Sequence, residues 1–264
     1  MENFEPVIRF GSFIGIFFIM ALWEVFAPRR PRTHTRLKRW PGNLGIVVID
    51  TLLLRILFPA ATVGVAAYAS TNNWGIFNVI QLPWVVSIIA CVLILDLAIY
   101  FQHRLFHIVP VFWRLHRMHH ADLDFDVTTG VRFHPIEIIL SMLIKFSFIV
   151  VLGAPVVAVV VFEVLLSATS LFNHSNAYIA PAIDRVLRWL VVTPDMHRVH
   201  HSVITTETNS NFGFNIPWWD RLFGTYRDQP QARHDGMTIG LEIFRDANEL
   251  RLDKMLLQPF REAT

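Results

Sequence analysis

Histidine residues gather in the middle of this chain at spacings that suit a metal site. Ten of its twelve histidines lie between His103 and His201. Imidazole is the commonest neutral metal ligand near pH 7. Spacings of three and four residues place side chains on one face of a helix, so each block predicts a ligand-bearing helix. The blocks are His103 with His107, then His116, His119 and His120, and then His197, His200 and His201.

The number of histidines predicts two metal ions. Eight imidazoles in three blocks exceed what one ion needs, and ordinary residues separate the blocks, so they are not a low-complexity tract. We therefore expect two ions that share a nitrogen-rich cage. His174 is a further candidate ligand, and His134, which precedes Pro135, is a candidate ligand or a partner of one.

Apolar segments predict an all-α integral membrane bundle of four or five spans. The 264-residue chain is 53% hydrophobic and 17% charged, whereas soluble domains carry roughly 25% charged residues. Stretches of about 20 apolar residues can cross a bilayer as helices. We expect one domain over 1–264, with a catalytic histidine region at about 96–228. The predicted spans are about 7–26, 44–69, 84–101, 136–152 and 155–172.

Loop charge predicts which side of the membrane carries the histidines. Six basic residues and no acid lie between Arg29 and Arg39, and short basic loops stay cytoplasmic. The N-terminus is then outside, and the histidines form a cytoplasmic helical cap. We interpret the basic loop as a topology and anionic-lipid anchor and expect no nucleic-acid binding. Because we see no eukaryotic retention signal, we expect a bacterial inner membrane, or the endoplasmic reticulum in a eukaryote.

Ionisable residues within the spans predict buried partners. Lys145 and Glu163 each lie nine residues from Ala154, at the turn between the last two spans, and so reach similar depth. They predict an interhelical ion pair, and the alternative is that Glu163 lines a cavity. Asp96 lies seven residues before His103 on the same helix face. It predicts either a hydrogen-bond partner behind a metal-bound histidine or a simple buried acid.

Other polar residues predict structural or surface roles. The only cysteine, Cys91, lies in the third span, so a disulfide within the chain and a Cys-based zinc or iron–sulfur centre are excluded. We expect the acidic turn at 122–126 and the side chains of His34 and His234 to face water. The segment from Trp218 to Tyr226 predicts packing rather than catalysis.

Several of these segments resemble the fatty acid hydroxylase/sterol desaturase superfamily. Its three histidine boxes are similar to the runs Asp96–His107, Trp113–His120 and Met196–Ser202. Further segments that resemble family signatures are 132–137, 172–176 and 219–226. The resemblance covers about residues 84–228, and three boxes in this order are a specific pattern.

The resemblance implies a non-haem di-iron enzyme that uses O2 to hydroxylate or desaturate a lipid, such as a sterol, a fatty acyl chain or a carotenoid. It implies that the eight box histidines and His174 bind two irons, with His134 as a ligand or its partner. A separate electron donor is also implied, such as a ferredoxin, a rubredoxin or a cytochrome with its reductase. Relatives that act on glyceryl ethers use tetrahydropterin. The segments 173–176 and 197–202 resemble theirs, so that alternative stays open.

Two non-enzymatic functions are alternatives for the same histidines. A metal transporter usually places polar ligands near the middle of the membrane, whereas these histidines follow the ends of predicted spans. A zinc-stabilised membrane protein would use about four ligands in a closed site, which is fewer than the eight found here. The lipid oxygenase is therefore the favoured prediction.

Overall fold

The computed structural model describes residues 5–80 and 82–262, and regular structure in this part of the chain is helical. Its described residues form no strand, only two isolated bridges, so the predicted all-α fold is confirmed. The longer helices are α1 (Glu5–Phe26), α2 (Arg36–Leu57), α3 (Ala61–Thr71), α5 (Trp84–Ile108), α6 (Pro110–His120), α7 (Pro135–Leu152) and α8 (Val156–Asn173). The shorter ones are α4 (Ile76–Val79), α9 (Pro181–Leu187), α10 (Pro194–His200), α11 (Thr205–Thr208), α12 (Trp218–Leu222), α13 (Arg233–Gly236) and α14 (Leu252–Leu257).

Five helical segments are long and apolar enough to cross a membrane, as the sequence predicted. Many of their apolar side chains, including Phe18, Leu52 and Val85, are exposed on the outside of the bundle. Such a surface is the one that lipid chains would cover. The segments are Pro6–Phe26, Arg36–Val79, Trp84–Ile108, Pro135–Leu152 and Val156–Asn173.

The second predicted span is broken, so our prediction of one helix over 44–69 was wrong. Helix α2 ends at Leu57, and α3 starts at Ala61 after Phe58-Pro59-Ala60. Proline lacks an N–H group, and its ring disfavours the helical conformation of the residue before it. Phe58 accordingly has φ −132° and ψ 64°. The chain then folds back through the short α4.

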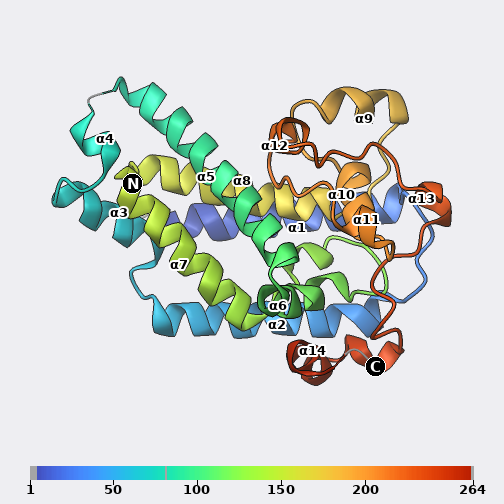
Figure 1. Ribbon diagram of the computed structural model, residues 1–264. Helices are drawn as coiled ribbons and strands as arrows, with labels where there is room; N and C mark the ends of the chain where they lie inside the picture. The colour runs from blue at the N-terminus through green and yellow to red at the C-terminus, as the bar shows by residue number, and fades with distance from the viewer. Residues whose placement is uncertain (1–4, 81, 263–264) are drawn as a thin grey trace.

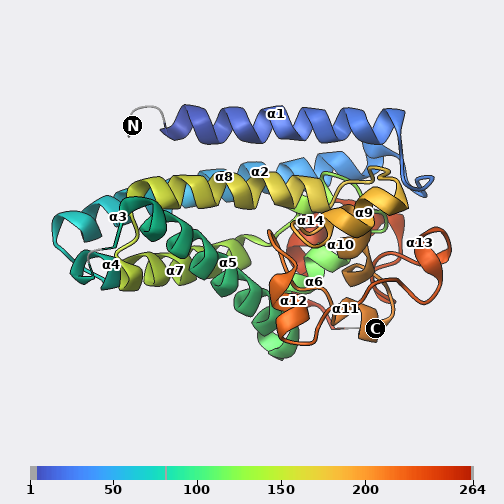
Figure 2. The same ribbon diagram turned by 90° about the horizontal axis from the view of Figure 1, so that it is seen from above.

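The histidine-bearing elements meet at one end of the bundle. Helices α6, α10 and α11 gather there with α12–α14, while α3 and α4 lie at the opposite end (Figures 1 and 2). Helix α5 packs against α6, α7 and α8, and α1 lies along α8. The C-terminal ends of α5 and α8 and the start of α7 therefore reach the same region, as a shared site requires.

The α7–α8 hairpin places charged residues inside the bundle. Its turn uses Gly153 at φ +63°, a left-handed conformation that glycine adopts without steric cost. The Lys145 Nζ lies 3.5 Å from the Glu163 Oε1, which confirms the predicted ion pair. Glu163 also contacts the Arg9 guanidinium of α1 at 3.2 Å. It lines a cavity as well, so both alternatives hold.

The acidic turn is buried against the basic loop, which corrects our expectation that it faces water. Arg39 is fully buried and donates to both oxygens of Asp122 at 2.8 Å and to Asp126 at 2.6 Å. Asp124 accepts from the backbone N–H of Thr33 at 2.7 Å. Burial would raise the pKa of Asp122, but the Arg39 guanidinium outweighs it and holds that pKa well below its usual range.

These contacts give the basic loop a structural role in addition to the predicted one. Three of its six cations bind carboxylates of the protein. Besides Arg39, Arg29 pairs with Asp195 at 3.0 Å and Arg36 with Glu24 at 2.9 Å. The loop therefore ties α1 and α2 to the cap that carries the histidines.

We predict that Arg39→Ala destabilises the protein by about 3–5 kcal/mol, because Asp122 and Asp126 are left buried without their cation. Thermal unfolding in detergent, followed by the loss of helical circular dichroism, measures the effect. Lys38→Ala is the matched control, since Lys38 is exposed on the same helix. Equal unfolding midpoints for the two variants would show that the cluster does not stabilise the cap.

Candidate metal centre

Nine histidines converge where α5, α6, α8 and α10 meet, and they fall into two groups. Within each group, one ring nitrogen of every residue lies within 4.8 Å of the others. Eight of the nine are buried, and His107 is half-buried. The first group is His103, His107, His116, His120 and His200, and the second group is His119, His174, His197 and His201.

The H-x-x-H-H spacing explains how each block serves both groups. Residues four apart share a helix face, whereas adjacent residues point about 100° apart. On α6, His116 and His120 belong to the first group and His119 to the second. The division is reversed at α10, where His197 and His201 belong to the second group and His200 to the first. The two helices therefore link the two groups.

Oxygen acceptors fix the ring orientation in the first group. The Nδ1 atom of His103 lies 2.8 Å from the Phe212 carbonyl oxygen, and that of His116 lies 2.6 Å from the Glu137 Oε1. These oxygens accept, so Nδ1 carries the hydrogen and Nε2 keeps a lone pair. Equivalent contacts join His107 to Asn209 at 3.1 Å and His200 to Ser210 at 2.8 Å. All five Nε2 atoms of the group lack a hydrogen-bond partner among the described residues.

Lone pairs face one another in the second group. The Nδ1 atom of His174 lies 2.8 Å from the Ser170 carbonyl oxygen, and that of His119 lies 3.2 Å from the Arg132 carbonyl oxygen. Their Nε2 atoms, which are then unprotonated, are 3.1 Å apart. The His197 Nε2 is 3.0 Å from the same His174 atom. The His119 and His174 lone pairs repel at this distance, and a cation between the rings would remove the repulsion.

Burial keeps these imidazoles neutral, which is the form that binds metal. It lowers the pKa of His174 to about 3. Burial and, next, the neighbouring histidines hold the pKa values of the other second-group members well below the usual range. Buried lone pairs without donors are costly. Neutral nitrogen donors in two groups therefore fit two divalent transition-metal ions.

A loop that we did not predict supplies three of the fixing oxygens. The segment 209–215 carries the acceptors on Asn209, Ser210 and Phe212. The carboxylate of Asp220 accepts from the backbone N–H groups of Phe212 and Gly213, both at 2.8 Å. Burial raises the pKa of Asp220 to about 6. The sequence signal was the segment around Asp220, which we interpreted only as packing.

Asp96 does not contact a grouped histidine directly, so of our two alternatives for it the structure favours the buried acid. Its Oδ2 accepts from the Trp219 Nε1 at 2.8 Å. The Nδ1 of His103 uses the Phe212 carbonyl instead. Asp96 therefore holds α12, which in turn holds the loop that orients His103.

Three histidines lie outside both groups, His34, His134 and His234, and the last two are buried against partners. His134 caps the start of α7: its Nδ1 accepts from the Ile136 N–H at 3.2 Å, and its Nε2 lies 3.3 Å from the Leu256 carbonyl oxygen. Both ring nitrogens thus have backbone partners. His234, which we expected on the surface, is only 3% exposed and lies 3.5 Å from the Asp195 carboxylate. This contact could not be predicted from the sequence, because it forms only when the C-terminal tail folds back over α10.

Comparison with known proteins agrees with this geometry. The sequence profile of the family described as fatty acid hydroxylase matches residues 88–225, which is more than half of the chain. The chain belongs to the fatty acid hydroxylase family. The matched region contains all nine grouped histidines and the loop that orients them.

Curated relatives of this hydroxylase-family chain are lipid-modifying enzymes by name. It is 29% identical over 151 residues to the ornithine lipid hydroxylase OlsE of Rhizobium tropici, covering 57% of this chain and 45% of that protein. It is 29% identical over 216 residues to the alkylglycerol monooxygenase of Xenopus tropicalis, covering 78% and 46%. A Delta(7)-sterol 5(6)-desaturase of Eremothecium gossypii is 29% identical over 144 residues, covering 54% and 38%. The chain thus spans less than half of each relative, and no solved structure matches it.

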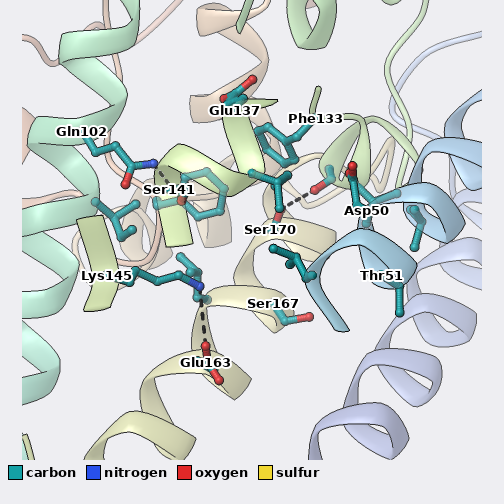
Figure 3. Close-up of a pocket in the computed structure, with 18 of the residues that line it drawn as sticks. Asp50, Thr51, Gln102, Phe133, Glu137, Ser141, Lys145, Glu163, Ser167 and Ser170 are labelled. Carbon is teal, nitrogen blue, oxygen red and sulfur yellow. Dashed lines mark hydrogen bonds and ion pairs between the residues drawn. The ribbon is translucent and has the colours of Figure 1, made fainter. Parts of the chain in front are cut away.

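A cavity of about 330 Å³ opens among the spans beside the second group. Ser170, whose carbonyl orients His174, lies in its wall. Phe133 also lines it and stacks on His119 with ring centroids 4.5 Å apart. Figure 3 shows Glu137 and Phe133 toward one end of this cavity and the Lys145–Glu163 pair toward the other.

A second cavity, of about 280 Å³, reaches the first group from segments outside the spans. It is lined by His107, Trp113 and Asn209, together with residues 241–243. The Trp113 ring contacts His107 and His120, with ring centroids 4.9 and 5.4 Å apart. The hydroxylase-family site therefore has one approach from the bundle and another from the cap.

We predict that His174→Ala lowers the metal content of the purified protein by about one ion per chain, because it leaves three ligands in the second group. His134→Ala is the matched control and should keep both ions, since its ring nitrogens bind backbone atoms. Elemental analysis after anaerobic reconstitution with iron measures the content. Loss of an ion from His134→Ala with retention in His174→Ala would reverse our assignment.

Proposed function

We propose that this chain is an O2-dependent di-iron membrane oxidoreductase that hydroxylates or desaturates a C–H bond of a lipid. The observation that carries the proposal is the pair of nitrogen cages beside a cavity among the spans. Family membership and the names of the curated relatives support it.

The donor set supports two transition-metal ions, and the family supports an oxygenase. Imidazole nitrogens suit iron, copper, nickel and zinc, so geometry alone leaves several metals. Two bound irons would supply the electron transfer to O2 and the oxidising power that an unactivated C–H bond requires. In hydroxylation, one oxygen atom enters the lipid and the other leaves as water, with two electrons and two protons from a donor. In desaturation, the lipid loses two hydrogens, and O2 becomes two waters with the same donor input.

The chain's own residues would bind the ions, orient the lipid and shield the site from water. The nine grouped histidines would hold the ions, and the carbonyl and carboxylate oxygens behind them would keep each ring in place. Phe133 and Phe214 line the cavity among the spans and contact the grouped histidines. They would help to position a lipid and to limit the access of water. Glu137 would keep the Nδ1 proton of His116 and face the bound lipid with its other oxygen.

We further propose that the cages lie on the cytoplasmic side, with the N-terminus outside, in a bacterial inner membrane. The basic loop beside them supports this orientation. Electrons would come from a separate ferredoxin, rubredoxin or cytochrome with its reductase. The second cavity supports an entry point on the cap, because Trp113 contacts two first-group histidines there.

A glyceryl-ether monooxygenase that uses tetrahydropterin is a second candidate. The match to alkylglycerol monooxygenase favours it, because that match covers 78% of the chain. Under this proposal, the second cavity would receive the pterin in place of a protein donor. A transporter is less well supported, since the ligands lie at the ends of the spans and are locked by hydrogen bonds.

The test begins with protein that is purified anaerobically from cells grown with iron. Elemental analysis and Mössbauer spectroscopy then count and characterise its bound metal. We expect about two coupled irons per chain. The iron-loaded protein should then consume O2 with a chemical reductant and a membrane lipid extract. Mass spectrometry with isotopically labelled O2 should show a lipid that gains labelled oxygen or loses two hydrogens.

One zinc per chain, with no iron uptake on reconstitution, would contradict the di-iron proposal. The matched negative control is His120→Ala, which removes a first-group ligand. A tetrahydropterin and a reduced ferredoxin, supplied separately, would distinguish the two donor classes by the rate that each supports.

A further inference from the structure

We propose that the part of the lipid substrate that enters the spanning cavity carries N–H or O–H donors, and that Asp50 binds them. This inference rests on the proposed function and narrows its substrate class. A bare hydrocarbon chain would not satisfy this cavity. An ammonium group and a hydroxylated group share the required chemistry, and the experiment below separates them.

Asp50 lies on the buried face of α2, where its neighbours are satisfied within the protein. Arg39 and Asn43 on that face bond to Asp122 and to other cap residues. Asp50 lies two turns beyond Asn43, is 8% exposed and lines the cavity. Its Oδ1 is buried and has no partner among the described residues. Figure 3 shows Asp50 at the cavity wall.

Two further acceptors line the same cavity from other helices. Gln102 of α5 donates its Nε2 to Ser141 at 3.0 Å, which leaves its Oε1 without a partner. Glu137 of α7 accepts from His116 with Oε1, and its Oε2 lacks a partner. Figure 3 places these side chains around one cavity. Unpaired acceptors therefore come from three helices.

The cations of the cavity wall are already engaged. Lys145 contacts Glu163 at 3.5 Å, and Arg9 contacts the same carboxylate at 3.2 Å. Among the described residues that line this cavity, the buried side-chain atoms without a partner are all carboxyl or amide oxygens. A buried carboxyl group without a partner is costly, and the cost is removed when a ligand donates to it. A site built this way rejects analogues that lack the donor, because its polar groups stay unpaired.

Binding to zinc-loaded protein tests the inference without turnover. The probes are octadecylamine against octadecyltrimethylammonium, and octadecylglycerol against its di-O-methyl ether, each titrated by native mass spectrometry in detergent. We expect at least one donor-bearing probe to bind about ten-fold more tightly than its capped counterpart, as hydrogen bonds to previously unpaired buried oxygens give.

Variants of Asp50 assign the preference to this residue. Asp50→Leu should remove it. Asp50→Asn keeps an acceptor oxygen, so it should weaken the preference less than Asp50→Leu does. Asp253→Asn is the matched control, because Asp253 lies on the exposed side of the short α14. Metal content and a single size-exclusion peak confirm that each variant folds.

Equal binding of donor-bearing and capped probes would overturn the inference, and so would an unchanged preference in Asp50→Leu. Its failure differs from failure of the proposed function. If iron-loaded protein oxidises capped and donor-bearing lipids equally, the substrate class is wrong and the oxygenase stands. If the binding preference is present but no lipid is ever oxidised, the binding site stands and the oxygenase fails.

Discussion

The site depends on one repeated contact, the hydrogen bond from an imidazole Nδ1 to a fixed oxygen. It occurs in six of the nine grouped histidines, with backbone carbonyls, an amide oxygen and a carboxylate as acceptors. Each contact sets a tautomer and turns an Nε2 lone pair inward. Without it, the rings could rotate and donate to one another, and the groups would lose their common direction. Metal affinity in such sites depends strongly on these outer contacts.

Folding and metal binding are coupled by the same geometry. Two groups of buried ring nitrogens without donors would oppose folding until cations occupied them. The rest of the cap resists that repulsion: Arg39 ties the acidic turn to α2, and Asp220 holds the 209–215 loop. The elements that hold the histidines therefore carry buried ion pairs and carboxylate–backbone bonds, not only apolar contacts.

Much of the fold and of the candidate site could be predicted from the sequence, because local residue spacing determines the helices and their histidine faces. The length of the apolar segments gave the spans, and the i, i+4 histidine pairs gave the ligand faces. What failed depends on partners distant in sequence. The aspartates at 122–126 look like a solvated turn until Arg39, more than eighty residues earlier, is brought against them. The break at Pro59 was missed because we drew the span from apolar length alone; Pro59 is a break signal, although Pro41 lies inside α2 without ending it. His134 shares the residue type of the grouped histidines, but its place at the start of α7 gives both its nitrogens backbone partners.

The arrangement of the two cages argues for chemistry over transport. A transported ion must exchange its ligands, which requires side chains that move between binding and release. Here each helix that carries an H-x-x-H-H block contributes to both groups, so the loss of one ion would disturb the ligands of the other. The rings are also held by loops and helix ends that are themselves cross-linked by buried polar contacts. Such a cage would retain its ions, and Phe133, which stacks on His119 and lines the cavity, would lie between them and a bound lipid. Tightly held ions beside a cavity among the spans would favour a reaction at a fixed position on a bound lipid.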